Sequence, residues 1–291
     1  MKTYHLSGDQ SFARRVPSGQ PAIMLSGEGG RLLCVDPRTG DRLSEHRLPP
    51  ELLRSGDPIT NVMFQRGGAR WLITEDEGER AWMCDGERWS EAAELPHANT
   101  LTDLCYLWAD EPLYLRQNFG INYFTWRSGA DRPRPSFDRL PAIRVRQQQA
   151  PWLQAVERQP GRGCQIHRTW QDTEDLVYHL YDAPTPKIGY ASWADPERDW
   201  SVEPTKPCLR LAGSADWLFS LVDGADGGTE IIAHHRSGGL LTIAGPEGAS
   251  LWDVETVITE AWSGLVAIAQ PDARPQPLLV TWTLDELAQR L

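Results

Sequence analysis

Four short apolar segments separated by tight turns fill residues 61–96, and this pattern constrains the fold more than any other part of the chain. The first two segments have the usual length of a strand, and Gly67-Gly68 between them supplies the positive φ of a two-residue hairpin turn. No window between the turns is long enough for the 3.6-residue period of a helix. The stretch therefore predicts a four-stranded antiparallel sheet, which must stack on similar sheets to bury both faces.

Weaker copies of this stretch recur along the chain. Residues 30–49 and 80–96 share an Asp turn, then an Arg, an apolar residue, Ser-Glu and a closing Leu-Pro. The Ser-Glu pairs at Ser44 and Ser90 are 46 residues apart, and fainter copies lie at 192–204 and 136–141. A period in the forties is typical of a β-propeller array.

The repeats, the D-G-x-x-W hairpin from Asp85 to Trp89 and the spread of 13 tryptophans resemble β-propeller repeat proteins of the tryptophan–aspartate or kelch-like kind. The Trp-Asp dipeptide of that family occurs once, at Trp252-Asp253, and the subfamily stays open. The chain is also similar to free-standing bacterial propellers that work beside an ATPase and a von Willebrand A protein. The resemblance implies an all-β fold, with residues 1–291 forming a single propeller domain.

We expect about seven four-stranded blades, with six as the alternative. The fourth and fifth sheets are the least clearly delimited, since Pro184 and Pro186 interrupt the fifth and proline is confined to strand edges and loops. The sheets are expected at residues 11–48, 61–96, 101–140, 142–171, 176–204, 216–254 and 256–283.

The two chain ends are expected to complete the last sheet. Its three strands need a fourth, and residues 4–6 can supply it, because pairing the two ends removes exposed sheet edges. A short C-terminal helix should follow, since Thr283 and Glu286 form a capping box and Leu284, Leu287, Ala288 and Leu291 fall on one face. We expect this helix to cover a sheet edge; a docking role for a partner is the alternative.

Composition indicates an ordinary soluble globular protein. The net charge of −11 disfavours nonspecific binding to nucleic acid or to an anionic membrane. Five cysteines without C-x-x-C spacing favour reduced, mostly buried thiols and a cytoplasmic location. We see no signal peptide and no apolar run long enough for a transmembrane helix, so no membrane association is expected.

Catalytic and metal-binding motifs are absent from the sequence. It lacks a phosphate-binding P-loop, an H-E-x-x-H zinc motif and a G-x-S-x-G nucleophile elbow. The adjacent His234 and His235 point to opposite faces of a strand, one toward the core and one toward the surface, and cannot readily share a metal. The acidic run Asp223, Asp226 and Glu230 departs from calcium-loop spacing and is better explained as a Gly-rich hairpin. We therefore expect no catalytic residue, no cofactor and no metal.

An arginine-rich segment is the most informative charge feature. Residues 127–168 hold nine arginines against three acidic residues, a local charge of +6 on an acidic chain. Arginine binds carboxylates bidentately, so the segment is a candidate docking surface for an acidic protein; the alternative is a set of solvated strand edges. The candidate side chains are Arg127, Arg132, Arg134, Arg139, Arg144 and Arg146.

Two functions of different class fit these observations. The first is a non-enzymatic scaffold for protein–protein interaction in a bacterial-type multi-protein assembly. The alternative is a propeller hydrolase that acts on a sugar or lactone through carboxylates of the central channel. An enzyme would need at least two convergent, perturbed carboxylates, whereas a scaffold would not.

Overall fold

The computed structural model of the chain divides into two compact units, residues 1–56 with 204–291 and residues 57–203, and each is described by itself. The described residues are 1–6, 13–27, 30–49, 59–64, 71–75, 80–84, 88–89, 93–94, 103–108, 111–117, 121–125, 134–135, 164–170, 175–181, 185–192, 195–272 and 276–291.

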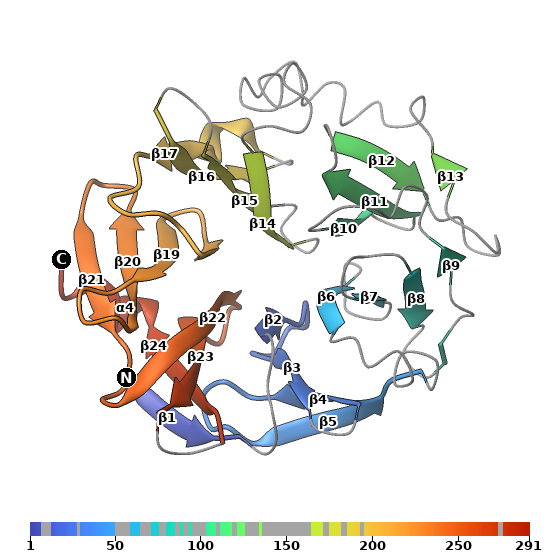
Figure 1. The fold of residues 1–291 in the computed structure, drawn as a ribbon, viewed down its shortest axis with the longest axis horizontal. Coiled ribbons are helices and arrows are strands. Elements are labelled where there is room, and N and C mark those ends of the chain that lie inside the picture. The colour runs from blue at the N-terminus through green and yellow to red at the C-terminus, as the bar shows by residue number, and fades with distance from the viewer. Residues whose placement is uncertain are drawn as a thin grey trace. The chain divides into compact units, whose positions relative to one another are not determined.

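The first unit contains three four-stranded antiparallel sheets with the strand orders β2-β3-β4-β5, β18-β19-β20-β21 and β1-β24-β23-β22 (Figure 1). Its elements are β1 (Lys2–His5), β2 (Ala13–Arg15), β3 (Ile23–Gly27), β4 (Arg31–Val35), β5 (Arg42–Arg47), β18 (Arg210–Gly213), β19 (Trp217–Asp223), β20 (Thr229–His235), β21 (Leu240–Ala244), β22 (Ala249–Ile258), β23 (Ser263–Pro271), β24 (Leu278–Thr283) and α4 (Leu284–Ala288).

The sheet β1-β24-β23-β22 buries both of its faces, as the stacking argument predicts. Successive side chains of a strand point to opposite faces, so along β23 Leu265 and Ala267 join one apolar cluster while Val266 and Ile268 join another. The first cluster is shared with β18–β21 and the second with β2–β4. This arrangement explains why β23 and β24 are almost continuously apolar.

The N-terminal strand pairs with the last sheet, which confirms that prediction. β1 lies antiparallel to β24, with Tyr4 opposite Leu279, and Figure 1 shows the four strands side by side. The hydroxyl of Tyr4 also donates to the carbonyl of Arg38 in the turn after β4. Gly40 in that turn has φ of 77°, and a Cβ added there would lie 2.7 Å from Cγ of Tyr4. A glycine is therefore required for the turn to contact β1.

The C-terminal helix α4 has the predicted capping box. Oγ1 of Thr283 accepts from the backbone N–H of Glu286, and the backbone N–H of Thr283 donates to Glu286. Leu287 is fully buried in the first apolar cluster and Leu284 packs against it. The predicted apolar face is wrong at Ala288 and Leu291, which are exposed, because the helix ends after little more than one turn.

The second unit also contains three four-stranded antiparallel sheets, with the orders β6-β7-β8-β9, β10-β11-β12-β13 and β14-β15-β16-β17. Its elements are β6 (Ile59–Phe64), β7 (Trp71–Glu75), β8 (Arg80–Cys84), β9 (Ala93–Glu94), β10 (Asp103–Trp108), β11 (Glu111–Gln117), β12 (Ile121–Thr125), β13 (Arg134–Pro135), β14 (Cys164–Trp170), β15 (Asp175–Leu180), β16 (Lys187–Ser192), the 3-10 helix η2 (Pro196–Arg198) and β17 (Trp200–Val202).

Two predicted sheet boundaries are wrong. Residues 250–254 and 256–258, assigned to different sheets, form the single strand β22, because the pairing with β23 runs without interruption from Asp253 to Ile258. Residues 164–170, assigned to the fourth sheet, form β14 and pair with β15. Residues 141–163, with the other two strands predicted for that sheet, lie outside the described residues. The structure contains six four-stranded sheets in its described part, and the choice between seven and six blades stays a prediction.

None of the described helices has the length and apolar character needed to span a membrane.

Candidate functional site

Two acidic side chains of β22 bind the backbone of β2, which is an edge strand of the neighbouring sheet. The backbone N–H of Ala13 donates to Oδ2 of Asp253 at 3.0 Å, and that of Arg15 donates to Oε2 of Glu255 at 3.3 Å. In an edge strand, the backbone N–H groups of every second residue point away from the neighbouring strand. The N–H groups of Ala13 and Arg15 point away from β3 in this way. The two-residue spacing of the acids matches the two-residue spacing of these donors. We call Asp253, Glu255 and these two N–H groups the carboxylate ladder.

Arginine completes the carboxylate ladder. Nη1 of Arg14 lies 2.9 Å from Oδ2 of Asp253, and both side chains are largely buried, with 13% and 4% of their surface exposed. The other oxygen of Glu255, Oε1, accepts from the backbone N–H of Thr256 at 2.8 Å. The ladder therefore joins two sheets, and its carboxylates are engaged by the protein itself.

The same strand is joined to the sheet on its other side. Oγ1 of Thr256 donates to the carbonyl of Gly213 in β18 at 2.5 Å, and both the Thr256 side chain and this bond are buried. β22 thus makes polar contacts with β2 on one flank and with β18 on the other. These contacts of the edge strand β22 hold three sheets in register.

The bulge in β22 exposes a tryptophan. Trp252 is the extra residue between Leu251 and Asp253, and 61% of its surface is exposed. Among the tryptophans whose side chains the structure describes, Trp252 is the only one in the exposed class. Bulges commonly redirect one side chain. The sequence places Trp252 beside Asp253 but gives no sign that the two side chains have different surroundings.

The acidic hairpin after β19 behaves as a turn, as the sequence favours. Oδ1 of Asp226 accepts from the backbone N–H of Gly228 at 3.2 Å, which closes the turn. Glu230 pairs with Nζ of Lys206 at 2.5 Å. These contacts give the hairpin a structural explanation without a calcium ion.

The acidic residues around η2 are also used locally. Oδ1 of Asp199 accepts from the backbone N–H of Ser192, and Oδ1 of Asp195 accepts from that of Glu197. Such bonds are the usual role of aspartate in turns. Two further acidic residues, Asp76 and Glu77 between β7 and β8, lie outside the described residues.

The adjacent histidines of β20 occupy different surroundings, as predicted. His234 is buried, and burial lowers its pKa. His235 is partly exposed, packs edge-on against Trp217 and lies 2.7 Å from Oγ of Ser237 through Nδ1. The alternation of a strand separates the two rings.

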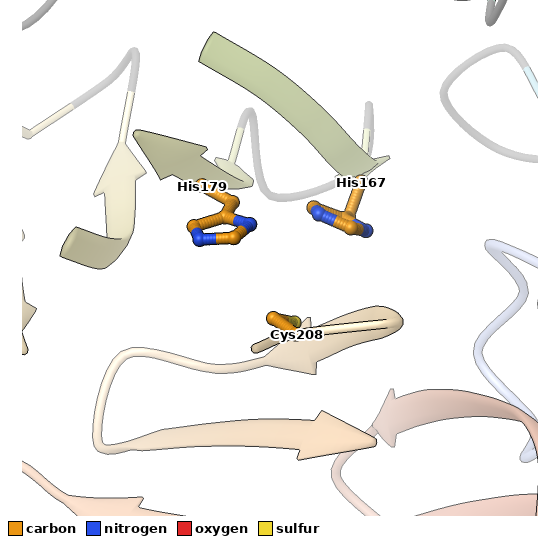
Figure 2. A group of neighbouring side chains, drawn as sticks. All are labelled: His167, His179 and Cys208. Carbon is orange, nitrogen blue, oxygen red and sulfur yellow. The ribbon is translucent and has the colours of Figure 1, made fainter. Parts of the chain in front are cut away.

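A second histidine pair is formed by residues that are twelve positions apart. His167 is the extra residue of a bulge in β14, between Ile166 and Arg168, and His179 lies on the paired strand β15. Figure 2 shows the two rings projecting from neighbouring strands, with their centroids 6.1 Å apart. Cys208, also drawn in Figure 2, belongs to the first unit, where its thiol donates to the carbonyl of Arg210.

The arginine-rich segment stays largely outside the described residues. Arg127, Arg132, Arg139, Arg144 and Arg146 all fall there. Only the backbone of Arg134 is described, and it lies in β13, opposite Thr125 of β12. β13 is the fourth strand of this sheet, and Pro135 stands in this edge strand, where proline is tolerated. Residues 136–140 lie outside the described residues.

Comparison with known proteins gives a fold but no family. No family model and no curated protein matches the chain. Among solved structures, the β-propeller domain of Cps50 (Swd1) from Myceliophteria thermophila is similar, with a TM-score of 0.53, 11% identity, and coverage of 96% of this chain and 97% of that one. Hsv2 from Kluyveromyces lactis matches with a TM-score of 0.45 and 11% identity over 90% of this chain and 71% of that one. The four-stranded antiparallel sheets and the likeness to the Swd1 domain together show that the fold is that of a β-propeller.

Proposed function

We propose that the chain is a non-enzymatic β-propeller scaffold that binds other proteins. The observation that carries the proposal is the exposure of Trp252 on the bulge of β22. Tryptophan is enriched among the residues that dominate binding energy in protein interfaces. An exposed tryptophan on a strand held between two sheets offers a partner a rigid apolar anchor.

The alternative, a hydrolase for a sugar or lactone, receives no support from the described carboxylates. Asp253 and Glu255 converge on one strand, as an enzyme would require. Both, however, accept hydrogen bonds from backbone N–H groups, and Asp253 also pairs with Arg14. A carboxylate whose oxygens already accept hydrogen bonds from the protein has fewer acceptor positions available for a substrate.

The test is binding to purified partners. Proteins captured with the tagged chain are produced separately, and their dissociation constants are measured for the wild type and for Trp252→Ala. Loss of a central interface tryptophan costs about 2 kcal/mol or more, so we expect a roughly thirtyfold weaker complex. Leu240→Ala is the matched control, since Leu240 is also apolar and 54% exposed.

Two results would overturn the scaffold proposal. One is the lack of any purified protein that binds saturably. The other is hydrolysis of a glycoside or lactone panel that disappears in Asp253→Asn while the variant stays folded. Equal affinities of the wild type and Trp252→Ala would instead remove Trp252 from the interface.

We further propose that the partner is acidic and docks on the arginine-rich segment. The support is the +6 charge of residues 127–168 on a chain of net charge −11. Complementary charge mainly raises the association rate and is screened by salt. The variant with Arg127, Arg132 and Arg134 all changed to Ser should associate more slowly at low salt, and an unchanged rate would show that the segment is only solvated.

The cellular setting completes the proposal. We infer a cytoplasmic location and an assembly of the bacterial type, with an ATPase and a von Willebrand A protein as the first partners to test. The support is the resemblance of the sequence to such free-standing propellers, together with the buried thiol of Cys34, which forms no disulfide. Cell fractionation and co-purification with each candidate provide the checks.

A further inference from the structure

We propose that His167 and His179 form a binding site for a zinc-like divalent transition-metal ion within the sheet β14–β17. This site is independent of the proposed scaffold function, since it uses only residues of the second unit that face each other across one hairpin. Imidazole nitrogen suits Zn²⁺, Ni²⁺ and Cu²⁺, whereas Ca²⁺ and Mg²⁺ prefer oxygen.

The bulge in β14 brings the two rings together. Regular pairing places Gln165 opposite His179 and Ile166 opposite Tyr178, and then Arg168 opposite Val177, so that His167 is the additional residue. A bulge inserts one residue and re-aims its side chain, and such features concentrate near functional sites. The rings end up tilted by 33° to each other rather than in edge-on contact.

The distance between the ring nitrogens is close to what one ion requires. A ligand nitrogen of His167 and one of His179 lie within 4.8 Å. Two nitrogens bound to one tetrahedral zinc at about 2.0–2.1 Å would stand about 3.3 Å apart. The proposal therefore requires the two rings to rotate toward each other when the ion binds.

The surroundings favour the form of histidine that binds metals. Both side chains are more than nine-tenths buried, with 7% and 8% of their surface exposed. Burial lowers the pKa of His179, so that its imidazole is neutral at pH 7, and a neutral ring is the ligand form. With two protein ligands, the ion would keep positions for water or for a donor group of a bound molecule.

The sequence does contain a signal for this pair, although a search for short metal motifs misses it. The segments CQIHRTW and DLVYHL form the two strands of one hairpin, and each carries one histidine. Regular pairing without a bulge would set residue 167 opposite Val177, on the same face as His179. The exact approach of the rings depends on the bulge, which local patterns do not reveal.

The test is a titration of the chelator-stripped chain with Zn²⁺ at pH 7.5 by calorimetry. We expect one saturable site per chain. The dissociation constant should be at least tenfold higher in His167→Asn and in His179→Asn. It should not change in the control His5→Asn, whose histidine is exposed. The affinity should fall as the solution is made more acidic, because protons then compete with the metal for the rings.

Several results would overturn the proposal: no saturable binding by the wild type, unchanged affinity in either histidine variant, or equal loss in the control. Circular dichroism of the metal-free proteins shows whether the variants fold. If they do not, nitrogen-15 spectra of the wild-type imidazoles decide the question, since Zn²⁺ should shift the signals of His167 and His179 together. A titration that shifts other histidines alone contradicts the site.

Discussion

The sheet β1-β24-β23-β22 and the sheet β14-β15-β16-β17 are both four-stranded and antiparallel, but their strands come from different parts of the chain. The first joins strands from both ends of the chain, whereas the second is contiguous from Cys164 to Val202. Each has a bulge in one of its edge strands, at Trp252 in β22 and at His167 in β14. In β22 the neighbouring polar side chains bind other sheets; in β14 the bulged side chain approaches a histidine of its own sheet.

A bulged edge strand can therefore place its polar side chains against another sheet or against a side chain of its own sheet. In the first sheet, β1 comes from the opposite end of the chain to β22–β24, and the carboxylate ladder also joins β22 to β2 through donors about 240 residues away in sequence. The second sheet is contiguous, and its two histidines lie on the two strands of one hairpin. The predictions below test this difference.

The largest effect is expected from deletion of residues 1–6. The deletion removes β1 from β24 and uncovers the core around the buried Leu6. Burial of one leucine contributes about 2 kcal/mol and each backbone hydrogen bond about 1 kcal/mol, so we expect the melting temperature to fall by about 10 °C or more. Thermal unfolding followed by circular dichroism measures the change, and an unaltered melting temperature would contradict the role of β1.

The next largest effect is expected from Asp253→Ala. It leaves Arg14 and the backbone N–H of Ala13 without their carboxylate partner in a largely buried place. Removal of one member of a buried ion pair costs about 3–5 kcal/mol. Urea unfolding measures this loss. The matched control is Asp226→Ala on an exposed turn, where a loss as large as that of Asp253→Ala would argue against the ladder.

A smaller effect is expected from Thr283→Ala at the start of α4. The variant removes the side-chain acceptor for the backbone N–H of Glu286. Loss of such a cap costs about 1 kcal/mol. The same urea measurement applies, and Thr283→Ser should retain most of the stability because serine keeps the hydroxyl acceptor. A Ser variant as unstable as the Ala variant would mean that the cap is not the cause.

The smallest effect is expected from pH, and it should occur in both units. Burial lowers the pKa of His234 and of His179 in the folded chain. Below the ordinary value of about 6.5 the unfolded chain binds more protons than the folded chain, so the free energy of unfolding decreases as the pH falls from 7 toward 5. Urea unfolding in the presence of a chelator should show a weaker pH dependence in His234→Gln than in the wild type. An identical pH dependence in the two proteins would contradict the contribution of His234.

Local sequence patterns predict the parts of this fold that depend on neighbouring residues. The hairpins of residues 61–84, the capping box at Thr283 and the missing strand of the last sheet follow from turn glycines, cap residues and a strand count. The continuity of β22 was missed because Trp252 and Asp253 end one apolar pattern and residues 256–258 start another. Regular pairing with β23 joins them, and the local composition gives no sign of this.

The polar contacts could not be predicted for a related reason. The match of Asp253 and Glu255 to Ala13 and Arg15 depends on the register between two sheets, which the sequence does not encode locally. The exposure of Trp252 likewise depends on which side of β22 the bulge turns outward. The arginine-rich segment was the clearest signal in the sequence, yet it lies mostly outside the described residues and its role stays a prediction.

The central claim, that Asp253 of β22 serves stability and the histidines of β14 and β15 serve metal binding, can be tested in one paired measurement. The free energy of unfolding without metal and the affinity for Zn²⁺ are measured for the wild type, Asp253→Asn and His179→Asn. The account predicts that Asp253→Asn lowers stability and leaves the zinc affinity unchanged, while His179→Asn weakens zinc binding at least tenfold with a smaller change in stability. Full stability of Asp253→Asn, or zinc binding by His179→Asn equal to that of the wild type, would contradict it.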